Sequence, residues 1–477
     1  MFHLRSTFLL ALVAGTISAA ALSPAAIAAD NSAETPYPIS SSLPAPVQTF
    51  LKVETSPGVF DIDYHYSHAT PADNGAYQRN INSPPTNWYI EDQRYGMSDV
   101  VGGVLHDDIP LLRTGLKMFD FAFDREASNG SFPGSDGHSL FHGTAYFLAA
   151  AGPAMLVLQN WVNEPTLPDG LPAHISWEIG RMKLAATYLV NKWWSSPGHI
   201  DDNGKEERKF EAAIALQSVG VLSGDAWLEQ KAAVYAQEGD AMTESNGVWT
   251  EHGITKLCCH DSSYQGQGLV YGTRYLALLP RGTALYTAVN RTVTLGEQWE
   301  VSRVSPSGVL NRTGDDRTGP TCPEQSTTGG CKTADLPAIA SALMRWSVLD
   351  NDFIYSRRAY YVWLQNWLLG PGNKLPAPGL AVTPATSMSV SDIHNGRSFS
   401  VAGTRFQPVE PVTVYFGTQA VGTTTADDIG SFGGHSAVGS VRFTPPATTT
   451  PGRYSIKVVG AYGTTRTIQV TITPVSA

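Results

Sequence analysis

The chain has 477 residues, a formal net charge of −10 at pH 7 and a sequence pI of about 5.6. This acidic balance, without a cluster of Lys or Arg, argues against nucleic acid as a partner, because phosphate binding requires a basic face. The length is sufficient for two or three domains with one large core.

Residues 1–28 have the pattern of an export signal. Arg5 supplies the positive start, residues 8–21 an apolar core, and Ala26-Ile27-Ala28 a small-residue cleavage site. No other apolar run approaches the roughly 18 residues of a membrane span. The sequence therefore predicts a secreted protein, extracellular or periplasmic, with no membrane span.

Residues 36–370 repeat one phrase, in which a Gly-marked turn and a polar loop lead into a helix of apolar periodicity. The phrase begins near residues 129, 198, 246 and 307. A spacing of roughly 50 to 70 residues is what a helical hairpin and its loop require, so about six hairpins are expected. We predict a mainly α domain, an incomplete (α/α) toroid, whose polar loops meet around one cleft.

The composition changes near Pro371, after which the chain is rich in Thr, Val and Gly. Residues 412–417, 439–446, 454–463 and 466–473 alternate β-branched or aromatic with small or polar residues between turn signals. We expect an Ig-like β-sandwich over residues 376–477. It is similar to small Ig-like modules appended to secreted glycan-active enzymes, which suggests contact with glycan or cell wall.

The four cysteines are expected to form disulfides, since the compartment is oxidising. Cys322 and Cys331 are nine residues apart across a Gly/Thr-rich loop, which favours a bridge between them. Cys258 and Cys259 form either a vicinal disulfide or crossed bridges to the other two cysteines.

Chemistry-bearing side chains are concentrated where a polar loop runs into an apolar helix pattern. His252 offers an imidazole, Glu251 and Asp261 offer carboxylates, and Tyr264 offers a phenol, all within about fourteen residues. Acid, base and charge-stabilising groups are therefore expected together. The alternative is structural, with Asp261 or Ser262 as the N-cap of the helix.

This segment resembles the catalytic segment of the polysaccharide lyases that cleave hyaluronate, chondroitin and xanthan. The resemblance rests, in order, on residues 246–249 (Asn-Gly-Val-Trp), His252, residues 263–266 (Ser-Tyr-Gln-Gly) and residues 278–280 (Leu-Leu-Pro). It implies that His252 and Tyr264 are the catalytic pair. It also implies a helical domain built as an incomplete ring of hairpins.

A second stretch, Trp177-Glu178-Ile179-Gly180, is similar to an aromatic-rich turn of the same family. The family's Asn is missing here, and Ala173 or His174 stands in its place. The family's arginine corresponds to Arg312 or Arg317. The large β-sheet domains of the family are replaced by one small sandwich.

The resemblance implies β-elimination from a uronate in an acidic polysaccharide. Removing the proton α to a carboxylate requires Asn, His or Arg donors that neutralise its charge, and a base that reaches C5. A Tyr can take this proton and return one to the leaving oxygen, with His252 assisting. No cofactor is needed for this chemistry.

Further residues are candidates for substrate contact. Trp249 and Trp177 are predicted stacking platforms, because sugar rings pack on indole faces. Arg94 and Tyr95 precede a helical pattern and are predicted to line the cleft. The remaining candidates are His138, His142, Glu251, His260, Asp261 and Gln265.

We expect no metal site. His138 and His142 are four residues apart, as a metal pair on a helix would be, but no zinc-protease Glu follows, and substrate contact is favoured. Cys258, Cys259, His260 and Asp261 also have metal-ligand types, but thiols outside the cytoplasm are usually oxidised.

Two rival functions remain open. A glycoside hydrolase on the same scaffold would use two carboxylates, from Glu251, Asp261, Asp99 and Asp108. A non-catalytic surface protein would hold glycan without cleaving it, and the sandwich and the Trp content suit that role equally well.

Overall fold

The computed structural model describes most of the chain after the predicted signal. The described residues are 39–67, 70–82, 87–135, 140–161, 170–193, 204–249, 260–305, 308–315, 318, 334–369, 379–384, 387–407, 410–426, 430–434, 438–461 and 463–474.

 Residues 1–28 and all four cysteines lie outside the described residues, so the signal and the disulfides stay predictions.

The first part of the described chain, up to residue 369, is helical, as predicted. Its elements are α1 (Ala45–Glu54), α2 (Pro57–Ser67), η2 (Gln78–Ile81), η3 (Ile90–Tyr95), α3 (Gly96–Leu105), α4 (Ile109–Phe123), α5 (Leu140–Gln159), α6 (Leu171–Trp193), α8 (Glu206–Ser223), α9 (Ala226–Asp240), α10 (Ser262–Ala277), α11 (Ala284–Arg303), α12 (Leu336–Asp350) and α13 (Phe353–Leu369).

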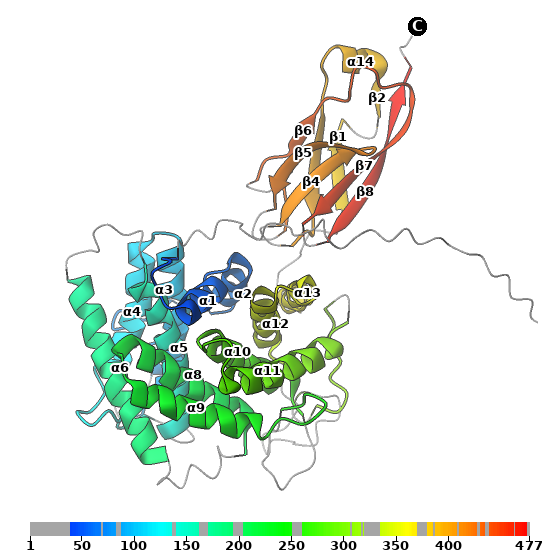
Figure 1. Ribbon diagram of the computed structural model, residues 1–477. Helices are drawn as coiled ribbons and strands as arrows, with labels where there is room; N and C mark the ends of the chain where they lie inside the picture. The colour runs from blue at the N-terminus through cyan, green and yellow to red at the C-terminus, as the bar shows by residue number, and fades with distance from the viewer. Residues whose placement is uncertain are drawn as a thin grey trace, which may run out of the picture. The chain divides into compact units, whose positions relative to one another are not determined.

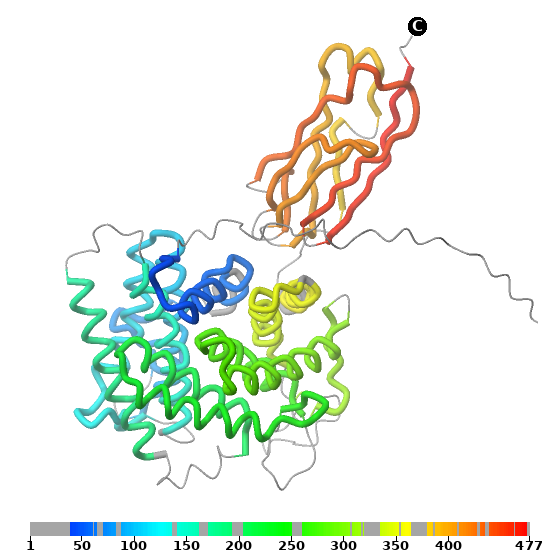
Figure 2. Tube along the Cα trace, viewed as in Figure 1, coloured from blue at the N-terminus to red at the C-terminus, as the bar shows by residue number. Residues whose placement is uncertain are grey.

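The helices pack as successive pairs, namely α3 with α4, α5 with α6, α8 with α9, α10 with α11, and α12 with α13 (Figures 1 and 2). The first helices of these pairs also pack on one another in chain order, from α3 through α5, α8 and α10 to α12. Helix α2 contacts both α12 and α3, so the series of contacts returns to its start.

Several helices begin at a side chain that accepts a hydrogen bond from a backbone N–H of the first turn. These N-caps are Asp108 for α4, Asp225 for α9, Asp261 for α10, Thr283 for α11 and Asp335 for α12. Each satisfies a donor that has no partner inside the helix. The polar ends of the predicted loops therefore fix where the helices start.

Helix α5 runs through the core of the helical part. Its stretch Phe141–Gln159 has 19 residues and is apolar enough, by length and composition alone, to cross a membrane. In the structure, 89% of this stretch is buried inside the protein, as in a core helix. The expectation that no apolar run besides the signal approaches span length is therefore corrected.

A buried ion network joins the first two helices to α10 and α12. Arg345 on α12 is fully buried and donates to both oxygens of Glu54 on α1, at 2.7 and 2.8 Å. Arg274 on α10 donates to the same carboxylate at 3.0 and 3.1 Å. Burial acts to raise the pKa of Glu54, but the two guanidinium groups outweigh it and lower that pKa to about 2. Arg345 also pairs with Asp63 on α2.

The second part of the chain is a small region of two sheets with a core of its own. The first sheet has three strands, in the order β1 (Gly379–Thr383), β3 (Phe399–Thr404) and β6 (Val441–Phe443). The second sheet has five strands, in the order β2 (Ser387–Ser389), β8 (Thr465–Thr473), β7 (Gly452–Gly460), β4 (Pro411–Phe416) and β5 (Gln419–Thr425). A short helix, α14 (Val390–His394), follows β2. Only β2 and β8 pair in parallel among these strands, and the other pairs are antiparallel.

The four strands predicted from alternation are confirmed as β4, β6, β7 and β8. Alternate residues of β3 and β4 are buried, as the period of two requires. Phe399 and Val401 from one sheet and Val414 and Val458 from the other are buried in the same core. The separate β-rich region is therefore present where the composition changes.

Close approach of α3 and α4 requires glycine at position 103. A Cβ on Gly103 would lie 2.5 Å from the backbone nitrogen of Leu112. Gly103→Ala is therefore expected to lower the free energy of unfolding by about 1–3 kcal/mol, because backbone overlap outweighs the gain in helix propensity. In α6, a Cβ on Gly180 would meet nothing within 4 Å, so Gly180→Ala should stabilise by about 0.5–1 kcal/mol. Urea unfolding measures both. Equal effects of the two variants would contradict the close packing.

The ion network predicts a defined response to pH. Glu54 has a pKa of about 2 in the folded protein and a reference value of 4.5. Its contribution to stability is therefore complete above about pH 4.5 and is lost as the pH falls toward 2. Glu54→Gln should be destabilised by about 3–5 kcal/mol at pH 7, because two buried guanidinium groups lose a counter-ion. The difference in the free energy of unfolding between wild type and Glu54→Gln, measured by urea titration, should become smaller from pH 7 to pH 3. A difference that stays constant over this range would show that Glu54 is not stabilised by the two arginines.

Candidate active site

A polar cavity lies among the helices that contain the predicted catalytic segment. Its volume is about 400 Å³, within the range of roughly 300–1,000 Å³ that small-molecule sites occupy. Its lining comprises Gln78, Arg79, Glu91, Asp92, Arg94, His142, Tyr146, Glu207, Arg208, Glu211, Ser263, Tyr264, Gln267, Thr318 and Asp335. A smaller cavity of about 120 Å³ shares four of these lining residues and is therefore adjacent to the larger one.

Tyr264 lies in the first turn of α10, and its half-buried side chain lines the cavity. The position of this turn is set by Asp261, whose carboxylate accepts from the backbone N–H groups of Ser263 at 2.8 Å and Tyr264 at 3.3 Å. The hydroxyl of Ser263 in turn accepts from the backbone N–H of Asp335 at 2.8 Å. The start of α10 is therefore tied to the start of α12 beside the phenol.

Arg94 extends into the cavity from the short helix η3. Its guanidinium donates to the backbone carbonyl of Glu91 at 2.7 Å and to the hydroxyl of Tyr95 at 2.9 Å. The guanidinium carbon lies 4.3 Å from the ring centroids of both Tyr95 and Tyr146. These cation–π contacts hold a planar group with several N–H donors at the cavity wall.

An imidazole and a buried carboxylate face the cavity from α5 and α8. Nδ1 of His142 lies 3.2 Å from Oε1 of Glu211, which is almost fully buried. The ring of His142 stacks on Tyr146, one helical turn away, with centroids 5.3 Å apart. His142 is therefore held in orientation by a ring on one side and a negative charge on another.

Three phenols in this region differ in their suitability as bases. Burial raises the pKa of Tyr146 and of Tyr271 well above the ordinary value for a phenol. The side-chain amide of Gln267 donates to both hydroxyls, to Tyr271 at 3.3 Å and to Tyr146 at closer range. Tyr264 lies at the cavity wall and is only half-buried, so it has more access to solvent and to a ligand than Tyr271, which is buried.

Five carboxylates also line the cavity, and several of them form ion pairs. Arg79 pairs with Asp92 at 2.8 Å and with Glu91 at shorter distance, and Arg208 lies 3.7 Å from Glu207. Glu211 faces His142. Four of the five carboxylates therefore lie beside basic groups of the cavity, and the fifth, Asp335, is the N-cap of α12.

Four predicted site residues come together at the two cavities, namely Arg94, Tyr95, His142 and Tyr264. They come from three separate elements, η3, α5 and α10. Together they provide a phenol, an imidazole and a guanidinium, which are the groups needed to neutralise an anionic ligand and move a proton.

Four predicted site residues, His138, Glu251, His252 and Arg317, lie outside the described residues. The assignment of His252 as the partner of Tyr264 stays a prediction from the family resemblance. The structure neither separates these two side chains nor brings them together.

Three other predicted site residues are buried and have structural roles. Trp249 is 2% exposed and stacks on Phe210 in the core, which leaves no indole face for a sugar. Gln265 is buried and donates to the carbonyls of Gly247 and Gly296. Asp261 serves as the N-cap of α10, so the structural alternative for it is confirmed.

The remaining predicted residues lie away from the lining of the two cavities. His260 lies 3.1 Å from buried Asp315 and packs edge-on against Trp299. Arg312 is exposed in the segment after α11. His174 and Trp177 lie on α6, where they form a second polar cluster with residues of α4.

The carboxylates proposed for a hydrolase do not form a pair at the cavity. Asp99 is fully buried on α3, and Asp108 is the N-cap of α4. Asp261 caps α10, and Glu251 is not among the described residues. The carboxylates that do line the cavity were not predicted from the sequence.

Sequence reasoning missed Tyr146, Glu211 and Gln267. Tyr146 follows His142 by four residues, and Gln267 follows Tyr264 by three, so both share a helical face with a predicted residue. This periodicity was the available signal. Glu211 comes from another helix, and nothing in the local sequence distinguishes it from other acidic residues of α8.

Comparisons with known proteins give little further guidance. No protein-family model matches the chain, and no curated protein matches it. One matching solved structure is the Pseudomonas fluorescens alkylpurine DNA glycosylase AlkC bound to DNA containing an abasic site analog. It is 10% identical, the match covers 80% of this chain and 96% of that chain, and the TM-score is 0.14.

This match corrects one expectation. Nucleic acid was excluded as a partner on the basis of net charge, whereas the matched protein is bound to DNA. That exclusion is withdrawn, because net charge describes the whole surface and a local basic site is compatible with an acidic chain. The TM-score is too low to carry an argument for the fold or for DNA binding.

Proposed function

We propose that the chain is a polysaccharide lyase that cleaves a uronate-containing polysaccharide by β-elimination at the cavity beside Tyr264. The observation that carries this proposal is that Tyr264, His142 and Arg94 line one cavity. The resemblance of the α10 segment to lyase catalytic segments supports the same assignment.

In the proposed mechanism, Arg94 and His142 bind the uronate carboxylate. The charge of the Arg94 guanidinium and an N–H of His142 stabilise the carbanion that forms when the C5 proton leaves. Tyr264 takes that proton as base and returns a proton to the leaving glycosidic oxygen, so that a double bond forms between C4 and C5 as the C4–O bond breaks. His252 assists the phenol, as the resemblance implies.

The circuit of helical pairs is, in this proposal, the (α/α) toroid of such enzymes, and the two-sheet region is an Ig-like module. Export by the N-terminal signal fits a large extracellular polymer as substrate. The runner-up is a glycoside hydrolase, for which the cavity carboxylates would supply acid and base.

The phenol of Tyr264 is the most direct test. Tyr264→Phe is expected to lower kcat by about 10²–10⁴-fold and to leave substrate binding nearly unchanged, because only the proton carrier is removed. The assay follows the ultraviolet absorbance of unsaturated uronate with hyaluronate, chondroitin, xanthan and alginate. Tyr286→Phe, on half-buried surface of α11, is the matched control.

Products separate the rival functions. New reducing ends without ultraviolet absorbance would replace the lyase by a hydrolase. Binding without any product would leave a glycan-binding protein. Full activity of Tyr264→Phe would remove the phenol from the mechanism.

Arg94 tests charge neutralisation separately. Arg94→Met is expected to lower kcat/KM by about 10- to 150-fold, because a hydrogen bond to a charged group contributes roughly 1.5–3 kcal/mol. Arg113→Met, at an exposed position of α4, changes the net charge by the same amount and is the matched control. Equal kcat/KM for the two variants would show that Arg94 does not contact the uronate.

A further inference from the structure

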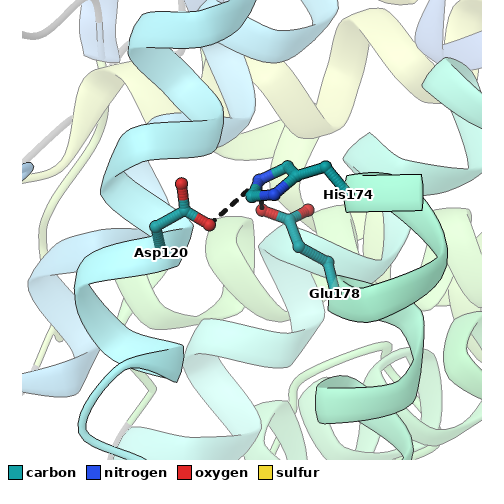
Figure 3. A group of neighbouring side chains, drawn as sticks. All are labelled: Asp120, His174 and Glu178. Atoms are coloured by element: carbon teal, nitrogen blue, oxygen red, sulfur yellow. Dashed lines mark ion pairs between the residues drawn. The ribbon is translucent and has the colours of Figure 1, made fainter. Parts of the chain in front are cut away.

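A second cluster of polar side chains lies between α4 and α6 (Figure 3). Nε2 of His174 lies 3.0 Å from Oδ1 of Asp120 and 3.5 Å from Oε1 of Glu178. His174 and Glu178 are one helical turn apart on α6, so both side chains face Asp120 across the interface. Two carboxylates thus converge on one ring nitrogen.

Glu178 is the unusual member of this cluster. It is 0% exposed, and neither of its carboxylate oxygens accepts a hydrogen bond from the described residues. A buried carboxylate normally has hydrogen-bond donors or a counter-ion. One proton on Nε2 of His174 cannot satisfy both Asp120, at the shorter distance, and Glu178.

Arg181, the arginine of α6, is engaged elsewhere. Nε of Arg181 lies 2.6 Å from Oε2 of Glu126, and its Nη2 donates to the backbone carbonyls of Phe123 and Glu126. The guanidinium of Arg181 is therefore directed to Glu126, and Lys183 of the same helix pairs with Asp225 at 2.9 Å. Glu178 faces the imidazole and a second carboxylate.

The spacing of the three side chains matches a metal site. One ligand atom from each of Asp120, His174 and Glu178 lies within 4.8 Å of the others. A tetrahedral zinc ion with bonds of about 2.0–2.1 Å places its ligand atoms about 3.3 Å apart. The observed 3.0 and 3.5 Å bracket that value.

We infer that Asp120, His174 and Glu178 bind a divalent first-row metal ion, with zinc the representative. The charges balance, because two carboxylates and a neutral imidazole compensate a divalent cation. The imidazole favours zinc and its neighbours over magnesium and calcium, which prefer oxygen-only sites. This assignment departs from the expectation of no metal site and does not depend on the proposed lyase activity.

The side chains around the cluster fix the orientation of the imidazole and leave the site accessible to solvent. The ring of Trp177 stacks on His174 with centroids 5.5 Å apart and also packs edge-on against Phe123, which fixes the imidazole plane. The side chains of His174 and Asp120 are 34% and 29% exposed, so the ion can enter and a water can occupy a fourth position.

The test is a calorimetric titration of the full chain, freed of metal by a chelator, with ZnCl₂. We expect binding at one high-affinity site per chain. Asp120→Asn and Glu178→Gln should each weaken that site at least about tenfold, because the amide keeps an oxygen but loses the charge, and His174→Asn should weaken it about 100-fold.

Controls separate loss of the site from loss of the fold. His394→Asn removes an exposed histidine of the two-sheet region and should leave the high-affinity site unchanged. Metal-free Glu178→Gln should melt at or above the wild-type temperature, because the substitution removes a buried charge. Zinc should raise the melting temperature of wild type and not that of Glu178→Gln.

Two results would overturn the assignment. One is the absence of high-affinity zinc binding by wild type. The other is zinc binding of equal affinity and stoichiometry by the triple variant Asp120→Asn/His174→Asn/Glu178→Gln, which would place the ion on other histidines.

Discussion

The buried carboxylate of Glu54, shared by Arg274 and Arg345, is the interaction on which the helical part depends. It joins α1 to α10 and α12, and Asp63 of α2 extends the network through Arg345. Desolvation of these charges is costly, and close bidentate geometry offsets that cost. Removing one partner would leave an uncompensated buried charge, so the packing of α1 and α2 on α10 and α12 depends on all of these side chains.

The same network reaches the candidate active site. Asp63 and Arg274 line the smaller cavity, which shares Arg94 and Tyr146 with the larger one. Helix α10 has Tyr264 near its start and Arg274 near its end. The helix is fixed at one end by the cap at Asp261 and at the other by Glu54, so the phenol is held on a rigid element, as the proposed proton transfer would require.

Local sequence features predicted the parts of this arrangement that depend on local physics. Helices, strands and the N-cap at Asp261 follow from periodicity and side-chain chemistry, and Tyr264, Arg94 and His142 were found as polar residues at the ends of helical patterns. Burial of Trp249 was not predictable from the local sequence, because its ring packs against Gly268 and Gly296 of two later helices. The pairing of His142 with Glu211 likewise depends on the packing of α5 on α8.

The roles of the carboxylates distinguish the two polar sites. At the cavity, Asp92 and Glu91 pair with Arg79, and Glu211 pairs with His142. A hydrolase needs one carboxylic acid that gives a proton to the leaving group, whereas carboxylates that serve as counter-ions leave the proton transfer to a phenol or an imidazole. In the cluster between α4 and α6, carboxylates outnumber basic groups, because two carboxylates share a single imidazole and Arg181 is engaged by Glu126. We therefore propose proton transfer for the first site, where the carboxylates are paired, and cation binding for the second, where two carboxylates share one imidazole.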